Sequence, residues 1–274
     1  MPQPTKTTLS LAVLSGKGGV GKSNLALNLA FALHKAGAKV LIMDFDVGLA
    51  NMDVLLGIAP EKNLQDLLRD GVAAKDVVVA IEPGGLDFLP AASGVPELLD
   101  MDEDAKDMLF GKLNQVFGAY DFLFLDLGAG INPLVMQVAA MAQTRLLIVT
   151  PEPTSLTDGY AVIKVLSCQR GVRDFLVVAN QVATHAEGKA TFERLALACK
   201  KFLDIDIVFF GSVLTDPAVP RAVRLQVPLL KSAPSSKAAK DILAVAARIV
   251  RFSRDNAENL RDLPILKKNT PQSP

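Results

Sequence analysis

A glycine-rich loop near the N-terminus carries the residue types that bind phosphate. The run Ser15-Gly16-Lys17-Gly18-Gly19-Val20-Gly21-Lys22-Ser23 follows a short apolar segment and precedes a helical pattern. It fits G-x-x-x-x-G-K-S, in which glycine N–H groups line an anion-binding nest, the lysine reaches the β- and γ-phosphates and the serine hydroxyl binds Mg²⁺. The expected nucleotide-binding residues are Gly18, Gly19, Val20, Gly21, Lys22, Ser23 and Asn24, with Ser23 also a metal ligand.

The same loop also fits the G-x-G-x-x-G pattern of dinucleotide-binding folds. Gly16, Gly18 and Gly21 have that spacing, and Asp44 ends the next predicted strand, where such folds place a ribose-binding carboxylate. A pyrophosphate at that turn needs neither an ammonium group nor a metal-binding hydroxyl, whereas a nucleoside triphosphate needs both. The pair Lys22-Ser23 therefore favours a triphosphate site over a dehydrogenase.

Acidic residues end two of the predicted strands. Asp44 and Asp46 lie two residues apart, so they share one face of an extended chain. One helix after a phosphate loop, this pair is typical of a switch segment in which a carboxylate orients the attacking water. Asp126 ends the apolar run Phe122–Leu125, the pattern of a Walker B strand that delivers an acid to Mg²⁺. Gly130 follows in a segment resembling switch II, where glycine N–H groups contact the γ-phosphate.

The run from Lys17 to Ser23 resembles the deviant Walker A motif of the MinD/ParA family of dimeric ATPases. The resemblance implies that Lys17 reaches across a nucleotide-sandwich dimer, where a cation from the second subunit stabilises transition-state charge only after closure. It also implies that Asp46 positions the water and that Asp44 lies near the magnesium. The expected catalytic residues are Lys17, Lys22 and Asp46, and the expected metal ligands are Ser23, Asp44 and Asp126.

The same resemblance assigns base recognition to two further positions. The family uses an asparagine at the end of its sixth strand and the segment after its seventh. Here these positions hold Asn180 and the run Leu214–Pro217, which includes Asp216. The resemblance implies ATP and Mg²⁺ as cofactors and a homodimer in the ATP-bound state. It also implies that ATP hydrolysis is slow and depends on dimerisation.

Three segments resemble a branch of this family, the flagellar-number regulators called FlhG or FleN. They are Gly48–Gly57, Leu89–Gly94 and Pro151–Ala161. This resemblance implies an ATP-dependent dimer that restrains flagellar assembly, with the GTPase FlhF or a flagellar transcription regulator as its partner. A MinD-like role in placing the division site and a ParA-like role in partition are the alternatives.

Other functions that use such a loop fit the sequence less well. A nitrogenase iron protein or an iron–sulfur cluster carrier would need paired cysteines after the switch segments, and the sequence has none there. Nucleic acid is not an expected partner, because 29 Lys plus Arg balance 29 Asp plus Glu and the longest basic runs are Lys200-Lys201 and Lys267-Lys268. No Ser-His-Asp arrangement is evident, and His34 and His185 are expected to be structural or solvated.

Short apolar runs alternate with helical patterns along the chain, which predicts a doubly wound α/β fold with a mostly parallel sheet flanked by helices. Half of the residues are hydrophobic and only 5% are aromatic, as is common where strands are buried on both faces. The expected strands are Leu9–Leu14, Lys39–Asp44, Leu86–Leu89, Phe122–Leu127, Leu146–Thr150, Phe175–Asn180 and Val208–Val213. The expected helices are Lys22–Lys35, Leu64–Arg69, Pro96–Phe117, Pro133–Ala142, Ser155–Leu166, Lys189–Phe202, Ala218–Val223 and Ser236–Phe252.

We expect one ATPase domain over residues 1–252 and a polar C-terminal tail over residues 253–274. Two interpretations of the tail stay open: a disordered segment, or a short amphipathic helix that contacts the inner face of the cell membrane. No secretory segment or apolar run long enough to span a bilayer is present, and Cys168 and Cys199 are expected to be reduced, buried thiols in a cytosolic protein. The tail residues that could face a membrane are Leu260, Leu263, Ile265 and Leu266, flanked by Arg261, Lys267 and Lys268 and interrupted by Pro264.

Overall fold

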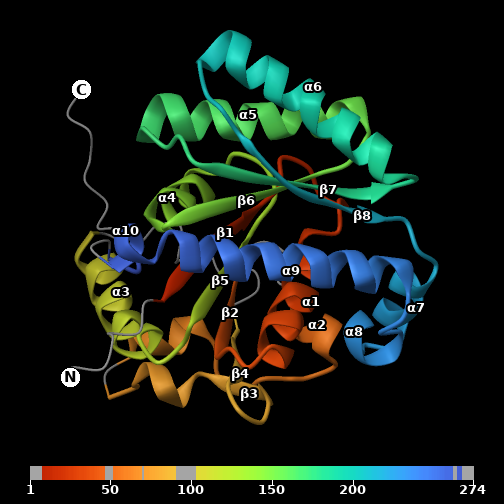
Figure 1. The fold of residues 1–274 in the computed structure, drawn as a ribbon. Coiled ribbons are helices and arrows are strands. Elements are labelled where there is room, and N and C mark those ends of the chain that lie inside the picture. Colours follow the sequence, from red (N-terminus) through yellow and green to blue (C-terminus); the bar gives the residue numbers. More distant parts are fainter. Residues whose placement is uncertain (1–7, 47–51, 70, 91–102, 262–263, 267–274) are drawn as a thin grey trace.

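The computed structural model describes residues 8–46, 52–69, 71–90, 103–261 and 264–266. Within this part of the chain, an eight-stranded sheet has the order β3-β4-β2-β5-β1-β6-β7-β8 (Figure 1). Neighbouring strands run parallel, except that β3 and β4 form an antiparallel hairpin. The predicted doubly wound, mostly parallel fold is confirmed. The strands are β1 (Leu9–Leu14), β2 (Val40–Phe45), β3 (Val79–Glu82), β4 (Leu86–Leu89), β5 (Phe122–Leu127), β6 (Thr144–Val149), β7 (Phe175–Val182) and β8 (Val208–Leu214).

Helices cover both faces of the sheet because its central strands are apolar on both sides. Along β1, Leu9, Leu11 and Val13 enter one buried core, and Ala12 and Leu14 enter the other. The first core is closed by α1, α8 and α9, and the second by α3, α4, α5 and α6 (Figure 1). The helices are α1 (Lys22–Lys35), α2 (Met52–Leu56), α3 (Glu103–Phe117), α4 (Pro133–Met141), α5 (Pro153–Arg170), α6 (His185–Leu203), α7 (Ala218–Arg224), α8 (Leu229–Ser232), α9 (Lys237–Asp255) and α10 (Ala257–Arg261), with 3₁₀ turns at Leu64–Leu68 and Ala74–Asp76.

Capping side chains mark where several of these helices begin. Asn132, Thr184 and Ser236 each accept a hydrogen bond from a backbone N–H in the first turn of α4, α6 and α9. Helix α5 ends at Gly171, whose φ of +67° closes the helix in the left-handed conformation that glycine adopts without strain. Local sequence therefore fixes where these helices begin or end.

The structure differs from the expected elements at several places. Strand β3 was not predicted, because its residues are half-exposed and it is joined to β4 by the tight turn Pro83-Gly84-Gly85. The expected helix Pro96–Phe117 is observed from Glu103, and its first residues lie outside the described part of the chain. Cys199 is buried as expected, whereas the prediction for Cys168 was wrong: this thiol is exposed on α5.

The described part of the C-terminal tail packs against the domain. Helix α9 runs to Asp255, three residues beyond the expected boundary, and Leu260 and Leu266 are buried. Ser10 donates a hydrogen bond to the carbonyl of Ile265, and Leu266 forms an antiparallel bridge with Ala142. Of the tail residues considered for membrane contact, Leu263, Lys267 and Lys268 lie outside the described residues. No helix in the described ranges has the length and apolar composition that would let it cross a membrane.

Asn28 links α1 to α8 and offers a direct test of the packing beneath the site. Its amide is fully buried, donates to the Asn24 carbonyl at 2.8 Å and accepts from the backbone N–H of Leu230 at 3.1 Å. Asn28→Ala leaves that buried N–H without a partner, so we expect the free energy of unfolding in urea to fall by about 1–3 kcal/mol. Lys35→Ala, an exposed change in the same helix, is the control and should stay within about 0.5 kcal/mol. Equal stability of the two variants would contradict this account.

Candidate nucleotide-binding site

The phosphate loop lies between the carboxyl end of β1 and the start of α1. Gly19 and Gly21 both have φ of +81°, a left-handed conformation that favours glycine. Gly21 is the N-terminal cap of α1, so the first free N–H groups of the helix border the loop. Alternating glycines in this conformation and a helix N-terminus together make a concave anion-binding backbone.

Lys22 is held in place by a buried carboxylate. Its Nζ donates to Asp126 Oδ1 at 2.7 Å and lies 3.2 Å from Ser23 Oγ. The Lys22 side chain is 7% exposed and the Asp126 side chain is 1% exposed. Each buried charge therefore needs the opposite charge of the other to offset its loss of hydration. The structure thus brings Lys22 and Ser23 of the phosphate loop together with Asp126, which the sequence placed in a separate strand-end motif.

Asp44 and Asp126 are register partners on the adjacent strands β2 and β5. Asp44 accepts hydrogen bonds from the backbone N–H groups of Asp46 at 2.9 Å and Met52 at 3.3 Å. Burial, and then the charge of Asp126, raise the pKa of Asp44 to about 7. Burial also raises the pKa of Asp126, and Lys22 opposes that rise. Two neighbouring carboxylates therefore share one lysine.

This arrangement fits a magnesium ion. Ser23, Asp44 and Asp126 supply hydroxyl and carboxylate oxygens, the ligands that Mg²⁺ prefers, and a divalent cation would offset the uncompensated carboxylate charge. In the described ranges, no group of three or more His, Cys, Asp or Glu residues is placed to hold a metal by itself. A magnesium ion here would therefore complete its shell with phosphate and water oxygens, as is usual for this metal.

The residues expected in the two switch segments meet beside the loop. Asp46 lies close to Gly128, since a Cβ built on that glycine would be 3.3 Å from Asp46 Oδ1. Gly130 donates its N–H to the Ser15 carbonyl at 2.9 Å. The N–H of Gly130 is thus engaged by the phosphate loop in this structure rather than directed at the nest. The rest of the first switch, residues 47–51, lies outside the described residues.

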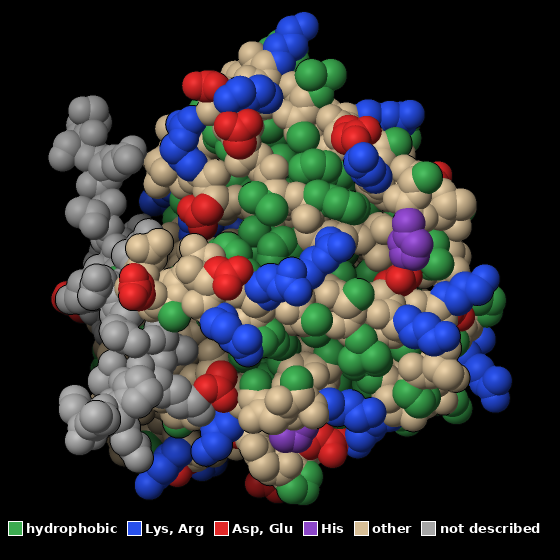
Figure 2. All heavy atoms as spheres, in the orientation of Figure 1, with side chains coloured by type: hydrophobic (Ala, Val, Ile, Leu, Met, Phe, Trp, Pro, Cys, Tyr) green, Lys and Arg blue, Asp and Glu red, His purple; other side chains and the backbone are tan. Residues whose placement is uncertain are grey.

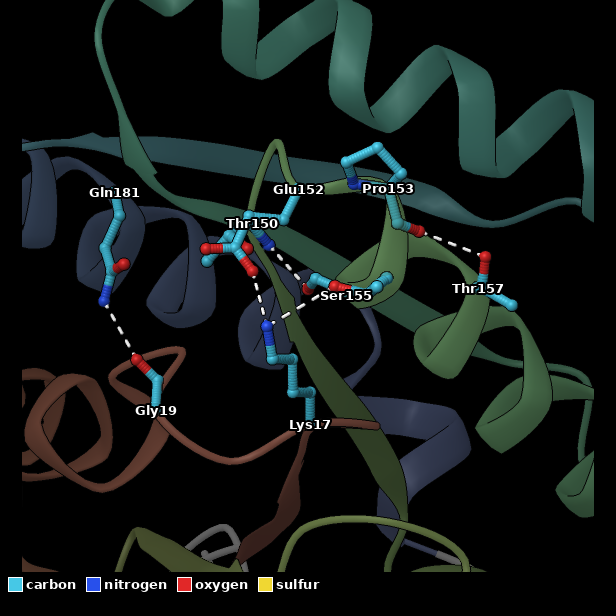
Figure 3. Close-up of polar contacts among 9 residues, drawn as sticks. Lys17, Gly19, Thr150, Glu152, Pro153, Ser155, Thr157 and Gln181 are labelled. Atoms are coloured by element: carbon cyan, nitrogen blue, oxygen red, sulfur yellow. Dashed lines mark hydrogen bonds and ion pairs between the residues drawn. The ribbon is translucent and has the colours of Figure 1, made fainter.

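Lys17 points away from Lys22 toward the start of α5. Figure 3 shows its side chain reaching Glu152, and its Nζ lies 2.6 Å from Glu152 Oε2 and 3.4 Å from Thr154 Oγ1. The Lys17 side chain is 41% exposed, so another molecule can reach it. The two lysines of one loop therefore have different surroundings, one buried and one at the surface.

A cavity of about 600 Å³ opens beside the loop. Asn180 donates its amide to the Val20 carbonyl at 2.8 Å, which leaves its side-chain oxygen as an acceptor. Asp216 accepts from the N–H groups of Ala218 at 2.9 Å and Ala238 at 3.2 Å, and these bonds hold its pKa below the usual range. Asp216 thus shapes the cavity by joining α7 to α9. The lining residues include Gly21, Asn24, Asn180, Gln181, Thr215 and Asp216.

One Ser-His-Asp grouping exists that sequence reasoning did not find. His185 Nδ1 lies 2.9 Å from Ser212 Oγ, and its Nε2 lies 3.4 Å from Asp241 Oδ1. A Cβ built on Gly188 would be 2.5 Å from the Ser212 side chain, so the backbone of α6 covers this hydroxyl. No substrate can approach Ser212 along that side, and the grouping joins α6, β8 and α9.

Glu152, Thr154 and Gln181 touch the loop but carried no signal in the sequence. Glu152 and Thr154 flank the proline that begins α5, where polar residues are ordinary. Gln181 follows Asn180 in a strand, and regular alternation would turn it to the opposite face. Only the three-dimensional path of β6 and β7 brings these side chains to the loop.

The chain is similar to known proteins over most of its length. A ParA family profile, described as an NUBPL iron-transfer P-loop NTPase, matches residues 6–250. The chain is 38% identical over 239 residues to the antiactivator FleN of Pseudomonas aeruginosa, covering 87% of this chain and 85% of that protein. It is 34% identical over 245 residues to the flagellum site-determining protein YlxH of Helicobacter pylori, covering 89% and 82%. The solved structure of the cell division ATPase MinD from Pyrococcus furiosus has a TM-score of 0.74 and 26% identity, covering 89% of this chain and 99% of that chain.

Asp44 makes the stability of the metal-free protein depend on pH. Its pKa of about 7 in the folded chain lies above the value of about 3.9 typical of an unfolded chain. Folding therefore becomes less favourable as the pH rises from about 4 to about 7, and the full penalty persists at higher pH. In buffer without Mg²⁺, we expect Asp44→Asn to raise the free energy of unfolding at pH 8 by about 1–3 kcal/mol, a gain limited because the amide has only one acceptor oxygen.

Urea unfolding at a series of pH values measures this effect. The difference between the variant and the original protein should shrink as the pH falls toward 4. Glu193→Gln, on the exposed surface of α6, is the charge-matched control and should leave the pH dependence unchanged. An Asp44→Asn protein that is less stable at every pH by the same amount would refute the assignment.

Proposed function

This chain belongs to the ParA/MinD family of P-loop nucleoside triphosphatases, and on that premise we propose that it is an ATP-dependent dimerising switch. In this proposal Lys22, Ser23 and the loop N–H groups bind the triphosphate, and Asn180 and the cavity beside it receive the base. Magnesium, held by Ser23, Asp44 and Asp126, would neutralise phosphate charge. Hydrolysis is slow and requires the dimer.

The contrast between Lys17 and Lys22 is the observation that carries the proposal. Lys22 is buried on Asp126. Lys17 is 41% exposed and points to Glu152 at the start of α5 (Figure 3). The contacts of Lys17 are a surface ion pair with Glu152 and a hydrogen bond to Thr154, and surface ion pairs contribute little to stability. The position of Lys17 suits a cation that enters the site of a second subunit and stabilises charge there as hydrolysis proceeds. Release from Glu152 is the step that this transfer requires.

The remaining catalytic step falls to Asp46. Its carboxylate lies beside Gly128, next to the predicted switch II segment, and its N–H is anchored on Asp44. A carboxylate so placed can orient the attacking water and accept a proton from it. Loss of the γ-phosphate would then free both switch segments, which lets the dimer separate.

The biological role we propose is control of flagellar number or assembly. The relatives that support it are an antiactivator, FleN, and a flagellum site-determining protein, YlxH, each matched over most of both chains. FlhF or a flagellar transcription regulator is the proposed partner. We propose that the protein acts in the cytoplasm, with peripheral membrane contact by the tail as a secondary feature.

A partition role is the second candidate, because α9 carries a basic face. Its basic residues are spaced along the helix and form no consecutive run in the sequence. Lys240, Arg248, Arg251 and Arg254 are exposed on this helix, and none has an ion-pair partner among the described residues. Figure 2 shows Lys and Arg side chains across the face where Figure 1 places α9. Such a face can meet a polyanion.

The described residues do not favour iron transfer, the activity named for the matching family profile. Cys199 is buried, Cys168 is exposed on α5, and within the described residues no cluster of potential ligands could hold an iron–sulfur group.

Changing each lysine separately tests the switch. Lys17→Ala should bind ATP with nearly unchanged affinity but lose at least about 100-fold in turnover, since a cation supplied by a partner subunit is commonly worth 10³–10⁵. Lys22→Ala should lose ATP binding itself. Calorimetry measures the affinity for ATP, and phosphate release measures turnover. Lys35→Ala is the control for both measurements. Full turnover by Lys17→Ala would remove the trans role, and tight ATP binding by Lys22→Ala would remove the phosphate-loop assignment.

The flagellar role is tested in cells. In a strain whose chromosomal copy encodes Lys22→Ala, we expect extra or misplaced flagella, because a protein that cannot bind ATP cannot restrain assembly. Electron microscopy counts flagella per cell. Normal flagella together with minicells or lost chromosomes would instead move the protein to the division or partition branch.

The partition candidate has its own test. If α9 binds DNA, the ATP-bound protein should be retained on a nonspecific duplex and released by salt, and replacing Arg248 and Arg251 by Ala should weaken retention and flatten the salt dependence. If the protein acts in flagellar control, we expect neither the original protein nor the variant with Ala at Arg248 and Arg251 to be retained on DNA in an ATP-dependent way.

A further inference from the structure

Strand β7 is irregular where it passes the phosphate loop. Its pairing with β8 shifts register between Ala179 and Val182, so Asn180 and Gln181 lie in a bulge. Gln181 has φ of +57°, a left-handed conformation that residues other than glycine seldom adopt. Its side chain is exposed, so core packing does not demand this conformation.

The bulge brings two consecutive amides to two consecutive carbonyls of the loop. Asn180 donates to the Val20 carbonyl at 2.8 Å, and Gln181 donates to the Gly19 carbonyl at 3.2 Å. Figure 3 shows the Gln181 side chain reaching down from β7 to Gly19. In a regular strand, neighbouring side chains point to opposite faces, and only one of the two could reach the loop.

These contacts fix the direction of the peptide planes that bind phosphate. In a planar trans peptide the C=O and the following N–H point in opposite directions. Gln181 holds the Gly19 carbonyl toward β7, so the Val20 N–H points away from β7. Asn180 holds the Val20 carbonyl toward β7, so the Gly21 N–H also points away from β7. Gly19 and Gly21 lack a Cβ, so without such contacts these planes can rotate easily.

We propose that Gln181, together with Asn180, is a positioning residue that holds the phosphate loop in its anion-binding conformation. The inference rests on the nucleotide site of the proposed function and adds a determinant of how that site binds phosphate. Asn180 also lines the base cavity, whereas Gln181 is exposed and contacts the loop through one amide donor. Gln181 is therefore the residue whose replacement isolates the effect.

Two replacements distinguish the contribution of the Gln181 side-chain amide from that of its left-handed backbone conformation. Gln181→Gly removes the amide and suits the left-handed φ, and Gln181→Met keeps the length of the side chain without a donor. Both should weaken ATP binding about 3-fold to 10-fold, the worth of one hydrogen bond. Gln181→Gly should unfold at the same temperature as the original protein or higher, because it relieves the backbone. A residue with a merely structural role would lose stability and affinity together.

Tripolyphosphate is the second probe, measured by displacement of a fluorescent ATP analogue from the full chain. Because the inferred effect acts on the phosphate nest, the affinity for tripolyphosphate should fall by the same factor as that for ATP. Gln226 supplies a matched control: it is exposed, has φ of +53° and donates its amide to the Val54 carbonyl at 2.9 Å, away from the loop. Gln226→Gly and Gln226→Met should leave both affinities unchanged.

Each other outcome overturns the inference. Weaker ATP binding with unchanged tripolyphosphate binding would show that Gln181 serves the base or ribose. Unchanged affinities in both Gln181 variants, with the original protein binding ATP normally, would reject the positioning role and leave the proposed function intact. Failure of the original protein to bind ATP would reject the proposed function and the inference together.

Discussion

The buried ion pair between Lys22 and Asp126 is the interaction on which the site depends. It joins the phosphate loop to β5 at 2.7 Å, in surroundings where either charge alone would be costly. Lys22 forms its hydrogen bond with Asp126, and burial together with the charge of Asp126 leaves the neighbouring Asp44 with a raised pKa. Buried groups with strongly shifted pKa values are typical of functional sites. An added cation would offset the excess negative charge of the two carboxylates.

The order of the sheet explains why these groups meet. β1 is central and is followed by the phosphate loop, and β5 lies between β1 and β2, so the acids that end β2 and β5 are neighbours. On the other side of β1, the ends of β6, β7 and β8 carry the remaining contacts to the loop and the cavity. In a doubly wound fold these carboxyl ends form one edge, which is where ligands bind. The residues contributed in this way are Lys22 after β1, Asp44 on β2, Asp126 on β5, Glu152 after β6, Gln181 on β7 and Asp216 after β8.

Much of this could be predicted because the relevant signals are local. Apolar runs gave the limits of β1, β4 and β5 as observed, and the spacing of the loop identified its lysines and serine. Signals that depend on tertiary structure were missed. The half-exposed β3 has no clear alternation, the left-handed Gln181 arises from register with β8, and the basic face of α9 appears only when residues are placed on a helix. The burial of Leu260 and Leu266 likewise depends on where the chain returns to the sheet.

The central claim is that bound ATP closes a dimer in which each subunit completes the site of the other. Its most direct test is the molar mass of Asp46→Ala protein loaded with Mg-ATP, measured by light scattering. In the proposed mechanism Asp46 orients the attacking water, so ATP should persist in this variant. We predict a mass twice that of the single chain with ATP, falling to that of one chain with ADP. A single-chain mass under saturating ATP would contradict the account.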